Sequence, residues 1–189
     1  MTYVEREIKL RFESPDVARA ALIQVGATPL RDRRLQDDRV YDWPDGRLTN
    51  ARCLLRVRRD GDTTKLTFKG PPQVASMKVR EEVEITVDDG ERLVTLLNRI
   101  GLTVRFRYQK FREEFERPGV VLAIDETPVG TFAELEGDEH GITATAAALG
   151  RKPSDYILDS YRGLFLKERQ ARGLDTGHML FETPSGNPS

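Results

Sequence analysis

The feature that most constrains this fold is a row of full charges along one face of nearly every predicted strand. In the opening segment YVEREIKLRF, Glu5, Glu7 and Lys9 fall on one strand face, and Val4, Ile8, Leu10 and Phe12 fall on the other. Because successive side chains of a strand point to opposite faces, this segment has one charged face and one apolar face. The same alternation places the following residues on charged strand faces: Glu5, Glu7, Lys9, Arg11, Arg56, Arg58, Lys65, Lys69, Arg80, Glu82, Glu84, Lys110, Arg112, Asp125, Glu134 and Glu136.

Two observations indicate that the charged faces point into the fold. A solvated sheet face ordinarily mixes charges with Ser, Thr, Asn and Gln, whereas nearly every position here carries a full charge. The predicted helices are amphipathic and need an apolar surface to cover, which leaves the charged faces inside. We therefore predict an α+β fold, a closed eight-stranded antiparallel β-barrel with a charged interior and helices packed outside. The alternative is an open sheet whose charged face is simply solvated.

A strand–helix–strand–strand–strand order occurs twice along the chain and suggests an internal duplication. The first half opens with EREIKL and a helix that ends at Gly26, and the second opens with EEVEITV and a helix that ends at Gly101. Ser14 as N-cap and Pro15 at the first helical position mark where the first helix begins. Predicted strands cover residues 4–12, 36–43, 53–60, 64–70, 79–87, 106–116, 120–126 and 132–137, and two closing helices cover residues 140–149 and 154–169.

Composition excludes several classes of function. The 30 Lys and Arg residues balance 31 Asp and Glu residues, whereas a nucleic-acid-binding protein usually has a basic excess. The single cysteine, Cys53, excludes an internal disulfide framework and a cysteine-based zinc site. We expect neither a signal peptide nor a membrane span, and so a cytoplasmic protein without a nucleic-acid or membrane partner. We also expect one domain over residues 1–170 and a disordered tail over residues 171–189.

The charged residues have the chemistry of a phosphoryl-transfer site. The acids come as pairs two residues apart, Glu5 with Glu7, Glu82 with Glu84 and Glu134 with Glu136, so each pair shares a strand face. Neighbouring carboxylates repel each other, and a divalent cation relieves that repulsion. Oxygen-only ligands favour Mg²⁺ or Mn²⁺. Arg and Lys on the other strands would gather a polyanion such as a phosphate chain. The chain has no Gly-rich phosphate-binding loop.

These motifs, taken in order, resemble a known family. EREIK fits the ExExK signature of the CYTH family, also called the triphosphate tunnel metalloenzymes. LLRVR, LTFKGP, VREEVEI, QKFREEF, the isolated Asp125 and GTFAELEG follow in the order of that family, and the resemblance covers Tyr3 to Tyr161. The family's fold is an eight-stranded antiparallel barrel with a charged bore, which agrees with the pattern argument.

The resemblance also implies roles for individual residues. Glu5, Glu7 and Lys9 would be catalytic, with Lys9 positioning the attacking water or the leaving group. The implied metal ligands, for Mg²⁺ or Mn²⁺, are Glu5, Glu7, Asp125, Glu134 and Glu136, with Glu82 and Glu84 at a second site. The implied triphosphate-binding residues are Lys9, Arg56, Arg58, Lys65, Lys69, Arg80, Lys110 and Arg112.

Three activities remain open on this scaffold. The first is a metal-dependent phosphohydrolase acting on inorganic triphosphate, thiamine triphosphate or a nucleoside triphosphate. The second is a class IV adenylyl cyclase, but the residues MTYV before ExExK lack the His-Phe pair of established cyclases. The third is a polyphosphate- or nucleotide-binding module without turnover. We expect a small-molecule triphosphate partner in each case, and the sequence leaves a homodimer open. Tyr161 is interpreted as a packing residue and Lys167 as a solvated one.

Overall fold

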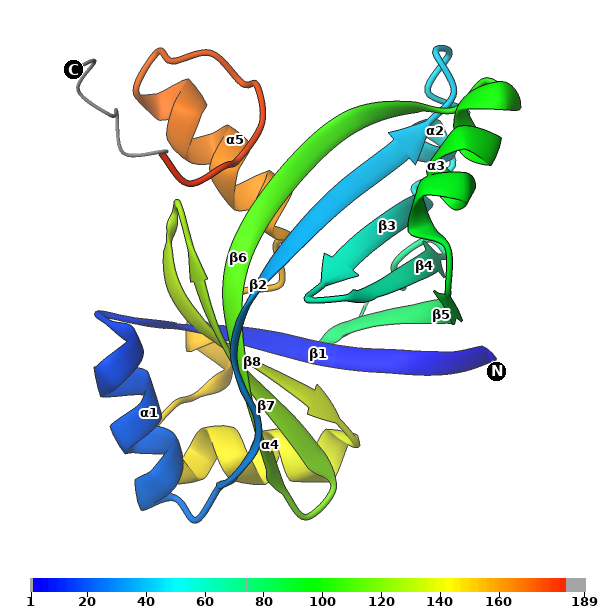
Figure 1. The fold of residues 1–189 in the computed structure, drawn as a ribbon. Helices are drawn as coiled ribbons and strands as arrows, with labels where there is room; N and C mark the ends of the chain where they lie inside the picture. Colours follow the sequence, from blue (N-terminus) through cyan, green and yellow to red (C-terminus); the bar gives the residue numbers. More distant parts are fainter. Residues whose placement is uncertain (1, 74, 183–189) are drawn as a thin grey trace, which may run out of the picture.

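The computed structural model describes residues 2–73 and 75–182, and its eight antiparallel strands close into a barrel (Figure 1). Around the barrel the strands follow the order β1-β5-β4-β3-β2-β6-β7-β8. The predicted α+β fold and closed antiparallel barrel are therefore confirmed. The strands are β1 Thr2–Phe12, β2 Thr28–Asp42, β3 Leu54–Asp60, β4 Thr63–Lys69, β5 Lys78–Val87, β6 Thr103–Arg117, β7 Val120–Thr127 and β8 Gly130–Gly137.

The helices follow the predicted repeat, with one short insertion. β1, α1, β2, β3 and β4 form the first half, and β5, α3, β6, β7 and β8 form the second. The duplication predicted from the sequence is thus visible in the order of elements. Among the described residues, no helix combines the length and apolar character that crossing a membrane requires. The helices are α1 Pro15–Gln24, the inserted α2 Arg47–Asn50, α3 Gly90–Arg99, α4 Glu139–Ala148, the 3-10 turn Pro153–Asp155 and α5 Tyr161–Ala171.

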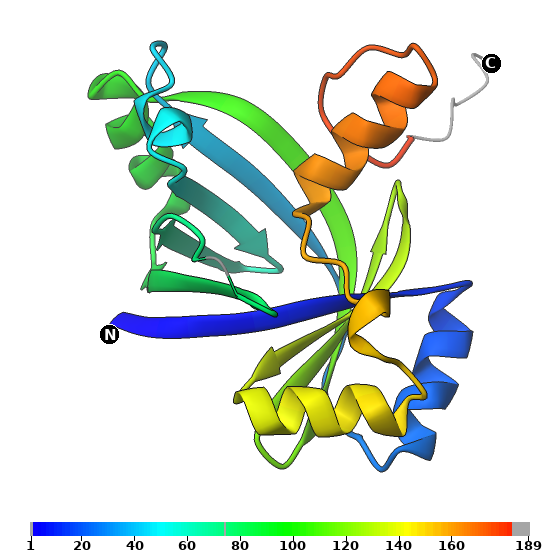
Figure 2. The same ribbon diagram turned by 180° about the vertical axis from the view of Figure 1, so that it is seen from behind.

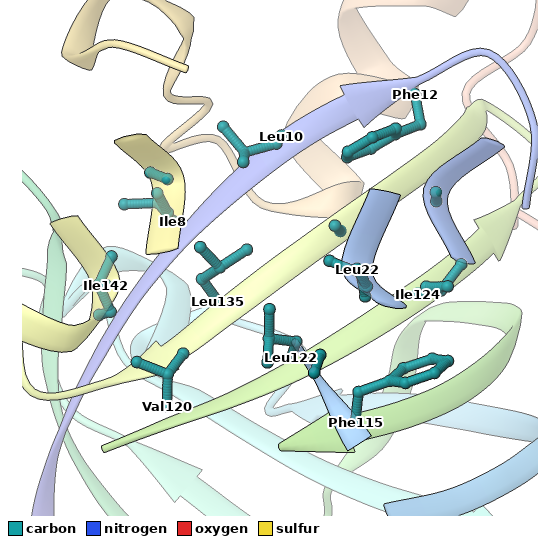
Figure 3. Packing of buried hydrophobic residues seen from close by; sticks show 14 of the residues in the cluster. Ile8, Leu10, Phe12, Leu22, Phe115, Val120, Leu122, Ile124, Leu135 and Ile142 are labelled. Atoms are coloured by element: carbon teal, nitrogen blue, oxygen red, sulfur yellow. The ribbon is translucent and has the colours of Figure 1, made fainter. Parts of the chain in front are cut away.

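Each half contributes a helix that covers strands of the other half. Helix α1 lies across β7 and β8, where its fully buried Leu22 joins a cluster with Leu122 and Ile124 (Figure 3). Helix α3 places Leu97 in a second cluster with Tyr41 and Val57, which belong to β2 and β3. The two halves are therefore interlocked, because each helix buries apolar strand faces of the other half.

The register of β1 shows why charge faces inward. Ile8 and Leu10 are completely buried on the outer face of the strand, within the cluster beneath the helices. Lys9 is also buried, at 2 % exposure, but it lies on the opposite face. Both faces of the strand are thus shielded, one by helices and the other by the barrel itself. The prediction that the charged faces line the interior is confirmed.

Helix α5 starts beside the barrel and packs near β6 and the turn between β7 and β8 (Figure 2). Its residues Tyr161 and Phe165 form an apolar cluster with Phe106 and Phe132, which lie on the same strand faces as the charged residues. The sequence prediction of a closing helix over residues 154–169 was wrong at its start. Helix α5 begins at Tyr161, because Ser160 adopts an extended backbone and caps the amide of Gly163.

The C-terminal segment is structured further than the sequence suggested. The expectation of a disordered tail from residue 171 is contradicted over residues 171–182, and residues 183–189 lie outside the described residues. Met179 is fully buried and exchanges backbone hydrogen bonds with Arg107 and Gln109 of β6. Phe181 packs on Phe111 with ring centroids 5.1 Å apart. The segment binds here because β7 pairs with β6 only from Phe111 onwards, which leaves this part of the β6 edge open.

Replacing Met179 with alanine should measurably destabilise the fold. Truncating a fully buried methionine leaves a cavity and usually costs about 2–5 kcal/mol of unfolding free energy. Urea unfolding followed by circular dichroism measures the change. Leu174→Ala is the matched control, because Leu174 in the same segment is 45 % exposed and its truncation should cost about 0.5 kcal/mol or less. Equal stability of M179A and wild type would mean that the segment does not pack on the barrel in solution.

Candidate functional site

A charged cavity of about 250 Å³ occupies the bore of the barrel. Its wall comes mainly from β1, β3, β4, β5, β6 and β8, and helix α5 contributes Ser160 and Tyr161 near its start. The lining contains nine Lys or Arg residues and seven Glu residues, so it carries a moderate excess of positive charge. These residues are Lys9, Arg56, Arg58, Lys65, Lys69, Lys78, Arg80, Lys110 and Arg112 with Glu5, Glu7, Glu82, Glu84, Glu114, Glu134 and Glu136.

The structure brings together every site residue predicted from the sequence except one. All the predicted glutamates and all the predicted bases line the cavity. Asp125 is the exception, because it is completely buried behind the wall and does not line the cavity. Arg11 leaves the bore, and its guanidinium lies 4.7 Å from the centre of the Phe132 ring. The charge-on-one-face pattern therefore located the site, although it assigned two positions too many to the cavity wall.

Lys9 and Glu7 form the centre of the β1 contribution. Lys9 Nζ lies 2.9 Å from Glu7 Oε1 and 3.1 Å from Glu134 Oε1, and Lys78 pairs with the same Glu7 oxygen. Burial opposes ionisation of Glu7, but the charges of Lys9 and Lys78 outweigh it and hold the pKa of Glu7 well below its usual range. Burial likewise opposes the charge of Lys9, yet Glu7 and Glu134 raise its pKa above the usual value. Lys9 is therefore protonated between these two carboxylates.

A second group of carboxylates carries more negative charge than its neighbours neutralise. Lys69 Nζ lies 2.6 Å from both Glu5 Oε1 and Glu82 Oε2. Glu136 forms no ion pair with any described residue. Burial and the neighbouring Glu5 raise the pKa of Glu136 to about 7, and burial and Glu7 raise the pKa of Glu5. Among the described residues, Lys69 alone forms ion pairs with the group Glu5, Glu82 and Glu136. The group therefore keeps negative charge that a divalent cation could neutralise.

This carboxylate group fits a hard divalent cation by its chemistry. Its donors are all carboxylate oxygens, which Mg²⁺ and Mn²⁺ prefer. Glu82 Oε2 is buried and accepts no hydrogen bond despite its contact with Lys69, so one oxygen has unused acceptor capacity. Within residues 2–73 and 75–182, no three acidic, His or Cys side chains already converge on one point as metal ligands do. Lys69 lies between two of the glutamates and neutralises part of their charge.

Two buried aspartates lie behind the cavity wall and pair with bases that line the cavity. Asp38 is completely buried and accepts a hydrogen bond of 2.8 Å from Arg58 Nε, with Arg56 Nε at 3.4 Å. Asp125 accepts from Arg112 Nε at 2.7 Å and from Lys110 Nζ at 2.8 Å. Burial and the neighbouring Arg112 lower the pKa of Lys110 to about 8. The aspartates thus hold the arginine and lysine heads beside the cavity.

Comparison with known proteins agrees with this geometry. The family model described as CYTH domain matches residues 4–170. The chain belongs to the CYTH family. A Methanocaldococcus jannaschii protein with the provisional name adenylate cyclase is 25% identical over 134 residues, which are 70% of this chain and 76% of that protein. Members of the CYTH family are typically enzymes that depend on a divalent cation, as triphosphatases or adenylate cyclases.

Solved structures share the fold of this CYTH protein. The PH1819 protein from Pyrococcus horikoshii superposes with a TM-score of 0.72 at 25% identity, over 87% of this chain and 99% of that one. HpAC1 from Hippeastrum, provisionally an adenylyl cyclase, superposes with a TM-score of 0.63 at 17% identity, over 93% of this chain and 97% of that one. At these identities the likeness to HpAC1 concerns the fold alone.

Sequence reasoning missed several residues of this CYTH site. Lys78 could have been found, because it stands two residues before Arg80 on the same face of β5. Asp38 gave no such signal, because its partners are known only once β2 and β3 are placed in register. Tyr161 is buried as a packing residue should be, but its hydroxyl also donates to Asp125 Oδ2 at 2.7 Å. Lys167 is solvated, as predicted.

Proposed function

We propose that this CYTH protein is a Mg²⁺- or Mn²⁺-dependent phosphohydrolase that removes the terminal phosphate from a triphosphate. The observation that carries the proposal is the cavity lining, in which nine bases surround a space that also holds a carboxylate group in excess of its counter-charges. A site built only to bind an anion needs no ring of carboxylates. Bases for phosphate oxygens together with carboxylates for a cation are the parts that phosphoryl transfer requires.

The proposed mechanism divides the cavity residues by charge. Glu5, Glu7 and Glu136 would hold the catalytic cation, with Glu134 beside them and with Glu82 and Glu84 at a second position. When bound, a divalent cation neutralises phosphate oxygens and makes a water molecule more acidic. The bases that would bind the triphosphate oxygens are Arg56, Arg58, Lys65, Lys69, Arg80, Lys110 and Arg112.

The chemical step is an in-line displacement by water. Water attacks the terminal phosphorus, the P–O bond to the rest of the chain breaks, and orthophosphate and a shortened phosphate chain leave with loss of one proton. Lys9 stays protonated, so it serves as a fixed positive charge beside the leaving oxygen. Glu7 would offer an ionised carboxylate to the cation, because Lys9 and Lys78 hold its pKa below the usual range.

The size of the cavity favours a small substrate. Its volume of about 250 Å³ lies below the roughly 300–1,000 Å³ of pockets that enclose drug-sized ligands. Inorganic triphosphate therefore suits the space better than a nucleotide whose base and sugar must also be enclosed. The precedent of HpAC1, which is described as having a dominant triphosphatase activity, points to hydrolysis as well. The runner-up is adenylyl cyclase, a name provisionally given to the Methanocaldococcus jannaschii relative.

Product analysis separates the three activities. The purified protein is incubated with Mg²⁺ or Mn²⁺ and, separately, inorganic triphosphate, thiamine triphosphate or ATP, and the products are identified by phosphorus NMR. We expect orthophosphate, with inorganic triphosphate as the best substrate. Cyclic AMP and pyrophosphate from ATP would establish the cyclase instead. Tight binding of triphosphate without any product would establish the binding module, and neither binding nor turnover would refute all three.

Metal binding should weaken below neutral pH. Because burial and Glu5 raise the pKa of Glu136 to about 7, Glu136 is ionised at pH 8 and mostly protonated at pH 6. Only the ionised carboxylate binds a cation, so the Mn²⁺ association constant should fall about tenfold over that range. Electron paramagnetic resonance of free Mn²⁺ measures this constant. In Glu136→Gln the constant should be lower at pH 8 and should fall less steeply as the pH is lowered. An equal pH dependence in both proteins would contradict the assignment.

A further inference from the structure

We propose that Asp125 and Tyr161 hold the phosphate-binding bases Lys110 and Arg112 in place, and that Asp125 takes no metal ion. The proposal deepens the proposed function, and it rests on that function only for the identity of the bound anion. It departs from the ligand set that the family resemblance implies, in which Asp125 stands with the glutamates. The reasons are where the Asp125 carboxylate lies, what it already binds, and how closely Asp38 matches it.

The Asp125 carboxylate is fully occupied and sealed from the cavity. Its exposure is zero, and it is absent from the cavity wall that all the predicted glutamates share. Oδ1 accepts from Arg112 Nε at 2.7 Å, and Oδ2 accepts from Lys110 Nζ at 2.8 Å, from Tyr161 Oη at 2.7 Å and from the second Arg112 nitrogen. An ion could reach this carboxylate only by displacing two positively charged side chains. Burial without these partners would be prohibitively costly for the carboxylate.

Asp38 is in the same situation on β2, which flanks β6 on the side away from β7. Asp38 stands directly opposite Arg58 in the β2–β3 register, and Asp125 stands directly opposite Arg112 in the β6–β7 register. In both pairs the second base, Arg56 or Lys110, lies two residues before the arginine on the same strand, so its head reaches the same carboxylate. Both aspartates have zero exposure. The structure thus places Asp125 with Asp38, as an anchor for two bases, and apart from the glutamates.

Tyr161 adds a neutral donor that the Asp38 pair lacks. Its hydroxyl donates to Asp125 Oδ2, and its ring centre lies 5.2 Å from both Lys9 Nζ and Lys110 Nζ. Helix α5 therefore supports the carboxylate and places an aromatic ring near two ammonium groups. Tyr161 lines the cavity, but its hydroxyl donates to Asp125, so we assign it to holding Lys110 and Arg112 in position and treat it as a positioning residue.

The first test measures Mn²⁺ binding alone, without any phosphate. Electron paramagnetic resonance of free Mn²⁺ compares Asp125→Asn, Asp38→Asn and Glu5→Gln with wild type. Glu5→Gln removes a proposed ligand and should weaken binding by at least about 30-fold. Asp38→Asn removes the same charge from the same wall and measures the long-range electrostatic effect. We expect Asp125→Asn to match Asp38→Asn, each within about threefold of wild type. Loss of Mn²⁺ affinity in Asp125→Asn comparable with that of Glu5→Gln would overturn the proposal.

The second test changes no charge and so avoids the risk that an unpaired buried cation unfolds the barrel. In Tyr161→Phe the Asp125 carboxylate loses one donor, and Lys110 and Arg112 should be held less firmly. We expect the KM for inorganic triphosphate to rise about 3- to 10-fold, with kcat within about twofold and Mn²⁺ affinity unchanged. Tyr156→Phe is the matched control, because that tyrosine packs on the outer cluster and should leave KM unchanged. A fall in kcat at constant KM would contradict the positioning role.

The anchoring role of Asp125 can be tested even if the proposed hydrolase activity is wrong. If the protein does not turn over triphosphate, binding of inorganic triphosphate in the presence of EDTA replaces KM as the readout of the Tyr161→Phe variant. The Mn²⁺ comparison of Asp125→Asn with Asp38→Asn and Glu5→Gln needs no substrate at all. An Asp125→Asn variant that binds Mn²⁺ normally would thus support the anchoring role even in a protein that proved to be a cyclase or a binding module.

Discussion

Replacing Glu7 with glutamine should lower metal-dependent hydrolysis of inorganic triphosphate by about a thousandfold while the barrel stays folded. Glu7 is buried in the cavity wall between Lys9 and Lys78, and it is ionised because those ammonium groups hold its pKa low. The amide keeps the shape of the side chain but removes the charge that the cation needs. Loss of one well-placed electrostatic contact in an enclosed site typically costs 10²–10³-fold in rate, and a metal ligand belongs at the upper end. Orthophosphate release measures the effect.

The control for this substitution is Glu113→Gln. Glu113 lies on the outer face of β6, next to Arg112 in the sequence, and pairs with Arg19 of helix α1 at 2.7 Å. Its replacement removes the same charge from the same barrel without touching the cavity, so kcat should stay within about twofold of wild type. Circular dichroism and thermal unfolding confirm that both variants are folded. A folded Glu7→Gln variant with wild-type turnover would refute the role of Glu7 in holding the cation.

Replacing Arg56 and Arg58 together with glutamine should weaken the binding of inorganic triphosphate by at least about a hundredfold. Both guanidinium groups line the cavity and are held by the buried Asp38, so they are pre-positioned for phosphate oxygens. Each hydrogen bond between charged groups contributes about 1.5–3 kcal/mol, and a factor of ten in affinity corresponds to about 1.4 kcal/mol. Titration calorimetry in the presence of EDTA measures this binding without the complication of turnover.

Arg59→Gln serves as the matched control for the arginine pair. Arg59 lies next to Arg58 in the same strand, but its side chain is 60% exposed on the outer face. Its loss should change the triphosphate affinity by about twofold or less, because solvent and salt screen its charge. A salt titration adds a second check, since the affinity difference between wild type and the double variant should shrink as ionic strength rises. Equal effects of the inner and outer arginines would show that the phosphate chain does not enter the bore.

The inward direction of the charged faces could be predicted because it depends on local patterns. Glu5, Glu7 and Lys9 alternate with Ile8 and Leu10, and this alternation assigns each residue to a face without any tertiary information. The amphipathic helices supply the apolar partner for one of the two faces. The closed barrel, the duplicated order of elements and the cavity wall all followed from these local signals.

The positions that were missed depend on contacts between distant parts of the chain. The C-terminal segment around Met179 contains too few apolar residues to predict a structured element, and it packs only because β7 leaves part of the β6 edge open. The start of helix α5 was predicted too early because Tyr156 and Ile157 continue the helical spacing of Tyr161, Leu164 and Phe165. In the structure Ile157 instead pairs with Lys9 of β1. In each case a tertiary contact outweighed a local preference.

Strand alternation is a property of each strand alone, so the amino-acid pattern was enough to assign residues to the bore. The pairing of individual charges depends on the register between strands, which long-range contacts set. Asp38 lies opposite Arg58, and Asp125 lies opposite Arg112, once the strands are aligned. The same alignment leaves Glu136 without an ion-pair partner among the described residues, beside Glu5. Bases thus neutralise Asp125, whereas Glu136 keeps the charge that we propose attracts a metal ion.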